Sequence, residues 1–191
     1  MKVLLLALVM LSGCASVPSD INDACVIFDE NGGWINNWHK QSKKVEREFG
    51  VPVPVMLATI WKESGFNHKA KPPRTRLLGF IPWKRPSDAY GYPQALKSTW
   101  RWYKEETGRS GADRDDFYDA MHFVGWYHTQ SNRRNNIPLN DAYHLYLAYY
   151  SGHGGYQRGT WKSNAWLKKA AGRVSSQAER YRAQLARCGR L

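Results

Sequence analysis

An apolar run that ends in a carboxylate constrains this chain more than any other feature. Residues 53–65 read VPVMLATIWKESG, in which Pro54 suits the first turn of a helix and Gly65 suits its end. The positions that share one face at helical spacing are Met56, Thr59, Ile60 and Glu63. The run therefore predicts a buried helix whose last turn carries Glu63 on its apolar side.

Glu63 is the candidate for chemistry in this helix. Two effects are expected to raise the pKa of its carboxyl, namely removal from water and proximity to the negative end of the helix dipole. A carboxyl that stays protonated near neutral pH can act as a general acid. The alternative is an ordinary glutamate that points to solvent or pairs with a neighbouring cation.

Size and charge limit the classes of protein to consider. The 191 residues suit one domain with a hydrophobic core, and an aromatic content of 14% argues against a disordered chain. A formal net charge of +12 favours an anionic partner. Nucleic acid, an anionic membrane face and an acidic polymer all meet this requirement, so charge alone does not choose among them.

The first residues predict export. Lys2 is followed by an unbroken apolar run over residues 3–11, which is too short to span a membrane and suits the core of a signal peptide. The run ends in Leu-Ser-Gly-Cys at residues 11–14, which resembles the lipobox of bacterial lipoproteins. We therefore expect a signal peptide over residues 1–13, a lipid on Cys14 and a tether over residues 14–24. An ordinary secretory signal with a chance cysteine is the alternative.

Export also decides among the partners. A chain that leaves the cytoplasm is not expected to bind nucleic acid. Ala15, rather than Asp, follows the lipidated cysteine. By resemblance to lipoproteins of Gram-negative bacteria, this favours a periplasmic protein anchored in the outer membrane. Cys25 and Cys188 remain as an even pair near the two ends of the domain, and in an oxidising compartment we expect them to form a disulfide rather than to stay as free thiols.

Hydrophobic spacing and turn residues predict a helical domain over residues 25–191. Gly172 is a possible break in the last predicted helix. The stretch over residues 140–150 is apolar nearly all round, so we expect that helix to be central. The helices are predicted over residues 34–49, 53–64, 93–107, 117–132, 140–150 and 163–186. The fold class is therefore all-α, with an irregular insert over residues 67–92 that can hold a small β-like piece.

Other chemistries find no support in the sequence. The chain has no His-Glu-x-x-His motif and no cysteine pair at zinc-ligand spacing, so we expect no metal. It has no Gly-x-Ser-x-Gly motif and no phosphate-binding loop, so we expect neither a serine nucleophile nor a cofactor. The Glu63 carboxylate remains as the reactive group.

Three motifs in order carry a family resemblance. They read ESGFN at residues 63–67, AYGYPQ at residues 89–94 and AYYSGHG at residues 148–154. The order resembles the lytic transglycosylases of the soluble-lytic-transglycosylase (SLT) type, which have a lysozyme-like fold. The resemblance covers residues 51–156. The chain departs from the family pattern at residues 92–93, where Tyr-Pro replaces Leu-Met, and at residues 150–151, where Tyr-Ser replaces Asn-Ala.

The resemblance implies a reaction and a set of site residues. Glu63 takes the place of a single acid/base that cleaves the bond between N-acetylmuramic acid and N-acetylglucosamine in peptidoglycan, forming a 1,6-anhydro ring without consuming water. Tyr149 is expected to orient the Glu63 carboxyl, and Gln94 and the Gly91 backbone to hold sugar groups. The further substrate contacts that we expect are Ser64, Tyr90, Ser151 and Tyr156.

The insert and its surroundings leave alternatives open. Its cationic side chains can meet the carboxylates of peptide stems in an anionic wall polymer; they are Arg74, Arg76, Lys84 and Arg85. Two carboxylates are usual in glycoside hydrolysis, and Asp88 is the nearest candidate for a second one. The alternatives are therefore a hydrolytic muramidase that uses Asp88, a catalytically silent peptidoglycan-binding lipoprotein, and an insert surface that binds an acidic partner or inhibitor. We expect the protein to be a monomer.

Overall fold

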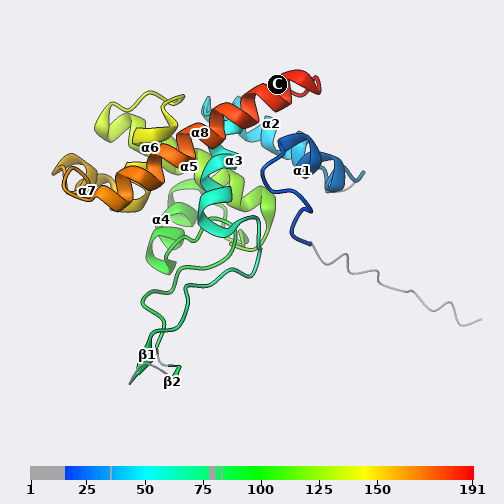
Figure 1. Cartoon of the computed structure of the whole chain (residues 1–191). Coiled ribbons are helices and arrows are strands. Elements are labelled where there is room, and N and C mark those ends of the chain that lie inside the picture. The colour runs from blue at the N-terminus through cyan, green and yellow to red at the C-terminus, as the bar shows by residue number, and fades with distance from the viewer. Residues whose placement is uncertain (1–15, 35, 78–80, 83) are drawn as a thin grey trace, which may run out of the picture.

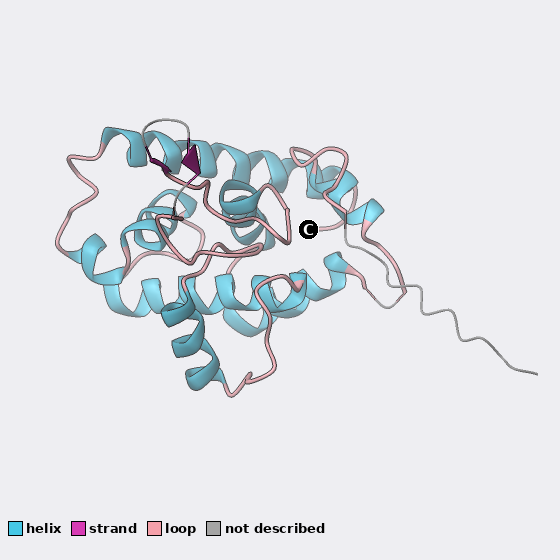
Figure 2. Cartoon of the chain, turned by 90° about the horizontal axis from the view of Figure 1, so that it is seen from below, coloured by secondary structure: helices cyan, strands magenta, loops and turns pink. Residues whose placement is uncertain are grey.

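The computed structural model describes residues 16–34, 36–77, 81–82 and 84–191. The predicted signal peptide and the lipidation site at Cys14 lie outside the described residues. The described chain is helical, as predicted, and its buried residues form one core. Figure 2 shows that helices make up most of the described chain and that its strands form one small hairpin. The helices are α1 Ala24–Glu30, α2 Trp38–Phe49, α3 Val53–Ser64, α4 Lys97–Thr107, α5 Phe117–Asn135, α6 Ala142–Ser151, α7 His153–Gln157 and α8 Ala165–Arg187.

The apolar run forms α3 as predicted. Pro54 stands in its first turn, and every residue of the helix from Val53 to Ile60 is buried. The helix ends at Gly65, whose φ of 56° is the left-handed conformation that glycine adopts without steric cost. Glu63 is thus in the last turn of α3.

Helix α2 begins later than predicted. Asn37 caps it, because the side-chain oxygen of Asn37 accepts a hydrogen bond from the Lys40 amide at 2.9 Å. Trp34, the first residue of the predicted helix, is 98% exposed and precedes the cap. The prediction of residues 34–49 was therefore wrong at its start, because the helix begins after the capping residue Asn37 and not at the apolar Trp34.

Helix α4 also begins later than predicted. Residues 91–94 form a turn rather than a helix, Ala95 pairs with Tyr90 in a short antiparallel bridge, and Gln94 has a φ of 48° in the left-handed region. The predicted end is confirmed, since Gly108 terminates the helix with a φ of 69°. Gln94, Ala95 and Leu96 line the cavity that is described below.

Two helices share the centre of the fold. Helix α5 packs on α2, α3, α4, α6 and α7, and a Cβ on its Gly125 would stand 2.8 Å from Val45 and 2.9 Å from Phe49. The lack of a side chain at Gly125 therefore lets α5 approach α2 closely. Helix α6, which was predicted to be central, does pack on α3, α5, α7 and α8, but its Tyr150 is 52% exposed. The more enclosed of the two is α5.

Helix α8 lies across α3 and α6 and is continuous through Gly172, so the predicted break is absent (Figure 1). Its C-terminal half holds the start of the described chain. Asn22 accepts hydrogen bonds at its carbonyl from Gln177 and Gln184, and Tyr181 donates to the carbonyl of Ile21. The tether predicted over residues 14–24 is thus shorter than expected, because its last residues are fixed on α8.

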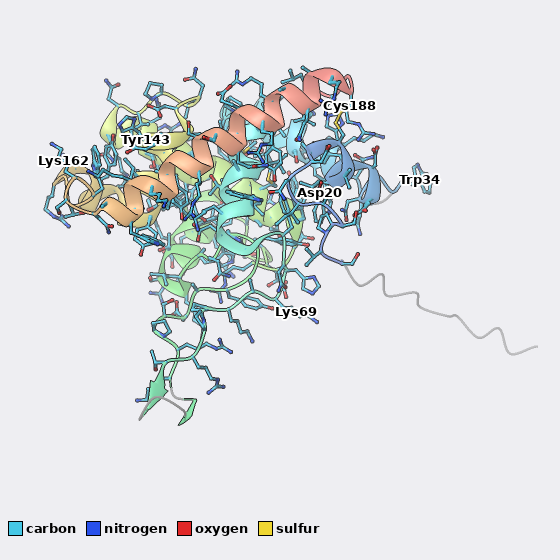
Figure 3. The ribbon with its side chains drawn as sticks, viewed as in Figure 1. Asp20, Trp34, Lys69, Tyr143, Lys162 and Cys188 are labelled. Atoms are coloured by element: carbon cyan, nitrogen blue, oxygen red, sulfur yellow. A yellow bond between two sulfur atoms is a disulfide. The ribbon has the colours of Figure 1, made fainter. Side chains whose placement is uncertain are left out.

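The predicted disulfide is confirmed. Cys25 in α1 and Cys188 at the end of α8 are bonded across a sequence separation of 163 residues. Figure 3 places Cys188 beside α1, at the end of the molecule where Trp34 projects outward. The covalent link therefore joins the two ends of the folded domain.

The insert over residues 67–92 projects from the helical body (Figure 1). Its outer part holds strands β1 Arg76–Leu77 and β2 Ile81–Pro82, which pair antiparallel. The β-like piece expected in the insert is therefore present as one short hairpin. Nearer the body, the amide and hydroxyl of Thr75 both donate to the Lys84 carbonyl, which holds the two arms of the insert together.

Candidate active site

A cavity of about 650 Å³ lies between the insert and the helical body. Its size is within the range of small-molecule sites. Helix α3 contributes the Glu63 carboxyl to the lining, and the insert contributes residues on another side. Aromatic rings of α5 and α6 form the surface that we call the floor of the cavity. The lining residues are Glu63, Pro72, Ser87, Ala89, Gln94, Ala95, Leu96, Thr99, Phe123, Tyr127, Tyr149, Tyr150, Ser151 and Gly152.

Glu63 is the candidate reactive group of this cavity. Burial raises the pKa of its carboxyl from 4.5 to about 7, and this effect outweighs the hydrogen bond from Tyr146 and the charge of Lys62, which both lower the pKa. The side chain keeps a partly exposed side, which lines the cavity. Glu63 is thus a carboxyl that is substantially protonated at neutral pH and accessible to a ligand.

The tyrosine that contacts Glu63 is not the expected one. Tyr149 was predicted to orient the carboxyl, but its hydroxyl donates to the Pro93 carbonyl at 2.6 Å. Tyr146, one turn earlier in α6, donates the side-chain hydrogen bond to Glu63. Tyr149 remains close enough for the Glu63 charge to raise its pKa, after the larger effect of burial. Tyr146 therefore orients the acid, while Tyr149 lines the cavity and holds the loop at Pro93.

Gln94 and Gly91 are hydrogen-bonded to each other and to Ala70 in the loop next to the cavity. The Gln94 side-chain amide donates to the carbonyls of Ala70 at 2.9 Å and Gly91 at 2.8 Å. The Gly91 amide donates to the same Ala70 carbonyl at 3.0 Å. The Gly91 backbone, expected to hold sugar groups, is therefore committed to the loop and buried. Gln94 does line the cavity, but its amide hydrogens hold the loop.

Asp88 does not face Glu63 across the cavity. Its neighbours Ser87 and Ala89 are lining residues, whereas the Asp88 carboxylate accepts a hydrogen bond from the Lys97 amide at the start of α4, at 3.1 Å. Among the described residues that line the cavity, Glu63 is the one carboxylate. The site thus offers one acid/base rather than a facing pair.

One sequence comparison bears on this geometry. A family model described as the transglycosylase SLT domain matches residues 2–188. The chain belongs to this family. Membership confirms the resemblance seen in the three motifs and extends it from residues 51–156 to nearly the whole chain. At the level of the family, the SLT domain is a peptidoglycan lytic transglycosylase that acts on glycan strands. No curated protein matches the chain.

The remaining predicted residues of the SLT domain fall into two groups. Ser151 lines the cavity beside Tyr150, at the end of α6. Outside the lining lie Ser64, whose hydroxyl donates to the Ile60 carbonyl, and Tyr90, whose hydroxyl donates to Asp115 at 2.9 Å. Tyr156 also lies outside, stacked on Trp161 with ring centroids 5.7 Å apart. Ser151 therefore lines the same cavity as Glu63, whereas these three residues are not among its lining.

Sequence reasoning missed the floor of the cavity. Phe123 and Tyr127 of α5 line it, and Tyr127 lies 5.0 Å from Tyr149 between ring centroids. Behind them, His128 of α5 bonds Thr59 of α3 at 3.0 Å. The helical spacing of Phe123 and Tyr127 could have shown that they share a face, but not that this face meets α6. Their exposure to the cavity depends on packing between helices.

The insert carries cationic side chains near the cavity that holds Glu63. Arg85 donates to the carbonyl of Pro72, a lining residue, and the Lys71 ammonium lies 5.3 Å from the Tyr90 ring centroid. Lys84 and Arg74 are exposed. The side chain of Arg76 lies outside the described residues.

The described residues carry neither a metal-binding cluster nor a membrane-spanning helix. Among them, no group of three or more His, Cys, Asp or Glu side chains is placed to hold a metal ion. None of the helices in the described ranges has the length and hydropathy required to span a membrane.

Proposed function

We propose that this protein is a lytic transglycosylase that cleaves the bond between N-acetylmuramic acid and N-acetylglucosamine with Glu63 as its acid/base. The observation that carries the proposal is that Glu63 is the single carboxyl among the described residues that line the cavity, with a pKa raised to about 7 by burial. Such a group is half protonated at neutral pH, so it can first give and then accept a proton without help from a second carboxyl.

The reaction needs Glu63 to donate one proton and then to accept one. Protonated Glu63 donates its proton to the glycosidic oxygen as the bond from that oxygen to the muramoyl C1 breaks. The Glu63 carboxylate then removes the proton from the muramoyl C6 hydroxyl, and the C6 oxygen bonds to C1. This closes the 1,6-anhydro ring, returns Glu63 to its protonated form and consumes no water. Tyr146 holds the carboxyl in place during both steps.

The placement of Asp88 favours this reaction over hydrolysis. A hydrolytic muramidase would use a second carboxylate to activate water or to attack C1. Asp88 caps the start of α4 instead, through its bond to the Lys97 amide. A ring closure by the substrate's own hydroxyl does not require that second group.

Digestion of purified peptidoglycan tests the proposal. The wild-type protein should release muropeptides with anhydro ends, which are lighter by one water than hydrated reducing ends, and Glu63→Gln should lose at least 100-fold in rate, roughly the contribution of a positioned acid/base. Asp88→Asn is the matched control and should retain its activity. Hydrated ends, or full activity of Glu63→Gln, would contradict the proposal. Binding of peptidoglycan without release of products would favour a silent wall-binding protein.

The proposal includes the place of the protein in the cell. We propose a monomer in the periplasm that is anchored in the outer membrane by a lipid on Cys14, because a basic residue, an apolar run and Leu-Ser-Gly-Cys occur in that order. Fractionation of cells that express wild type and Cys14→Ser tests this part. The variant should leave the outer-membrane fraction and lose incorporation of labelled palmitate, and an unchanged distribution would contradict the anchor.

A further inference from the structure

Two exposed aromatic rings lie side by side at the edge of the cavity. Trp166, at the start of α8, is 53% exposed, and Tyr150, near the end of α6, is 52% exposed. Their ring centroids are 5.4 Å apart with an interplanar angle of 56°. Tyr150 also lines the cavity that holds Glu63. The aromatic surface of this pair, Tyr150 and Trp166, is therefore continuous with the catalytic cavity.

Positive charge borders the aromatic pair. The Lys62 ammonium lies 5.9 Å from the Trp166 ring centroid, and Lys62 directly precedes Glu63 in α3. Trp166 can reach α3 because α8 lies across both α3 and α6 (Figure 1). On α8, the exposed Lys169 and Arg173 follow Trp166 at helical spacing on the same face. A ligand on the aromatic pair would thus have cations within reach.

The dimensions of the cavity require such a surface. A cavity of about 650 Å³ holds a ligand of small-molecule size, whereas a glycan strand is a polymer. The strand must leave the cavity across its rim, and the aromatic pair forms part of that rim. The face of a pyranose ring carries several C–H groups, which pack well on the electron-rich face of an indole or phenol ring.

We propose that Tyr150 and Trp166 form a saccharide subsite that extends the Glu63 cavity onto α8, with Lys62 placed to meet a carboxylate of the same strand. The inference rests on the proposed function, since it takes a peptidoglycan strand as the ligand. It adds a binding surface that the three motifs do not predict. Its consequence is that affinity depends on strand length beyond the part held in the cavity.

Trp34 provides the matched control for Trp166. It is 98% exposed and projects at the far end of the molecule, near Cys188 and away from the start of α8 (Figure 3). The same substitution at both positions therefore removes an exposed indole with and without the proposed contact. Because each side chain is more than half exposed, neither substitution should unfold the protein.

Binding measurements on the full chain with Glu63→Gln test the subsite, because this change preserves the ligand. The probes are a disaccharide and an octasaccharide of the peptidoglycan repeat, titrated by calorimetry. Trp166→Ala should weaken binding of the octasaccharide about tenfold, the effect of uncovering roughly 60 Å² of apolar surface, and weaken the disaccharide far less. Trp166→Phe should restore most of the affinity for the octasaccharide, and Trp34→Ala should change the affinity for neither ligand.

Oxidation of exposed indoles gives a second measurement without any substitution at the subsite. N-bromosuccinimide should oxidise both Trp34 and Trp166 in the free protein, and octasaccharide should protect Trp166 alone, as located by peptide mass spectrometry. Equal affinity of Trp166→Ala and Trp34→Ala, or no protection of Trp166 by a bound strand, would overturn the subsite and leave the proposed function intact. Product release by Glu63→Gln would instead overturn the proposed function, whatever Trp166 does.

Discussion

The hydroxyl of Tyr146 donates a hydrogen bond to the carboxyl of Glu63, across the contact between α6 and α3. Tyr146 is buried, and burial together with the nearby Glu63 charge raises its own pKa, so the phenol stays protonated as a donor. A donor aimed at a carboxyl favours the charged form. This bond therefore limits how far burial raises the pKa of Glu63 and also fixes the position of the acid.

Removal of this bond should move the pH dependence of the reaction. In Tyr146→Phe, the pKa of Glu63 should rise above its value of about 7, because the interaction that stabilises the carboxylate is lost. The alkaline limb of the kcat/KM profile, which reports deprotonation of the acid, should shift to higher pH by about one unit, and the maximum should fall about tenfold. Tyr143→Phe on the same helix is the control and should leave the limb unmoved. An unshifted limb in Tyr146→Phe would contradict the assigned bond.

Glu63 should also make stability depend on pH. Its pKa is about 7 in the folded protein against 4.5 as the reference, so its contribution is fully present below pH 4.5 and is lost as pH rises through 7. Glu63→Gln carries no such group. The free energy of unfolding of wild type relative to Glu63→Gln should therefore fall between these pH values, by up to about 3 kcal/mol. Urea denaturation of both proteins from pH 4 to pH 8 measures this, and a constant difference would contradict the raised pKa.

The sequence predicted the ends of helices where a local interaction sets them. Gly65 and Gly108 terminate α3 and α4 at the predicted positions by adopting left-handed conformations, and α5 begins at the predicted residue 117, where Asp116 caps it through the Asp119 amide. The predicted start of α2 was wrong because two residues within four positions can each mark a helix start, namely the apolar Trp34 and the capping Asn37. The rules for capping residues and for hydrophobic spacing each indicate a start, but they do not say which of the two prevails.

The sequence points to Glu63 as the candidate acid but does not predict which side chains surround it. Tyr146 and Tyr149 are three residues apart in α6 and so lie on nearly the same face. Only the rotation of α6 against α3 decides which hydroxyl reaches Glu63, and that rotation depends on the packing of α5 and α8. For the same reason, periodicity could not show that Tyr150 meets Trp166 at the rim.

Two glycines should respond in opposite directions to alanine. Gly91 has a φ of 74°, and a Cβ there would stand 2.1 Å from the Arg114 carbonyl oxygen, so Gly91→Ala must displace the loop that carries Gln94. We expect a loss of about 3 kcal/mol or more in the free energy of unfolding. Gly172 lies inside α8 with open space around its Cβ position, so Gly172→Ala should add about 0.5–1 kcal/mol. Denaturation curves of the two variants against wild type check both signs, and a neutral Gly91→Ala would show that the loop is not held as described.

The disulfide should account for much of the stability of the domain. It closes a loop of 163 residues, for which the chain-entropy estimate is about 5 kcal/mol. The bonds from α8 to Ala24 and from Arg190 to the Cys25 carbonyl would persist after reduction, so the reduced protein should keep its fold while its urea midpoint falls. Urea curves with and without reductant measure the change. The double variant Cys25→Ser with Cys188→Ser should have the urea midpoint of the reduced protein, and reductant should not change that midpoint. If reduction left the wild-type midpoint unchanged, the disulfide would not be a constraint on the unfolded chain.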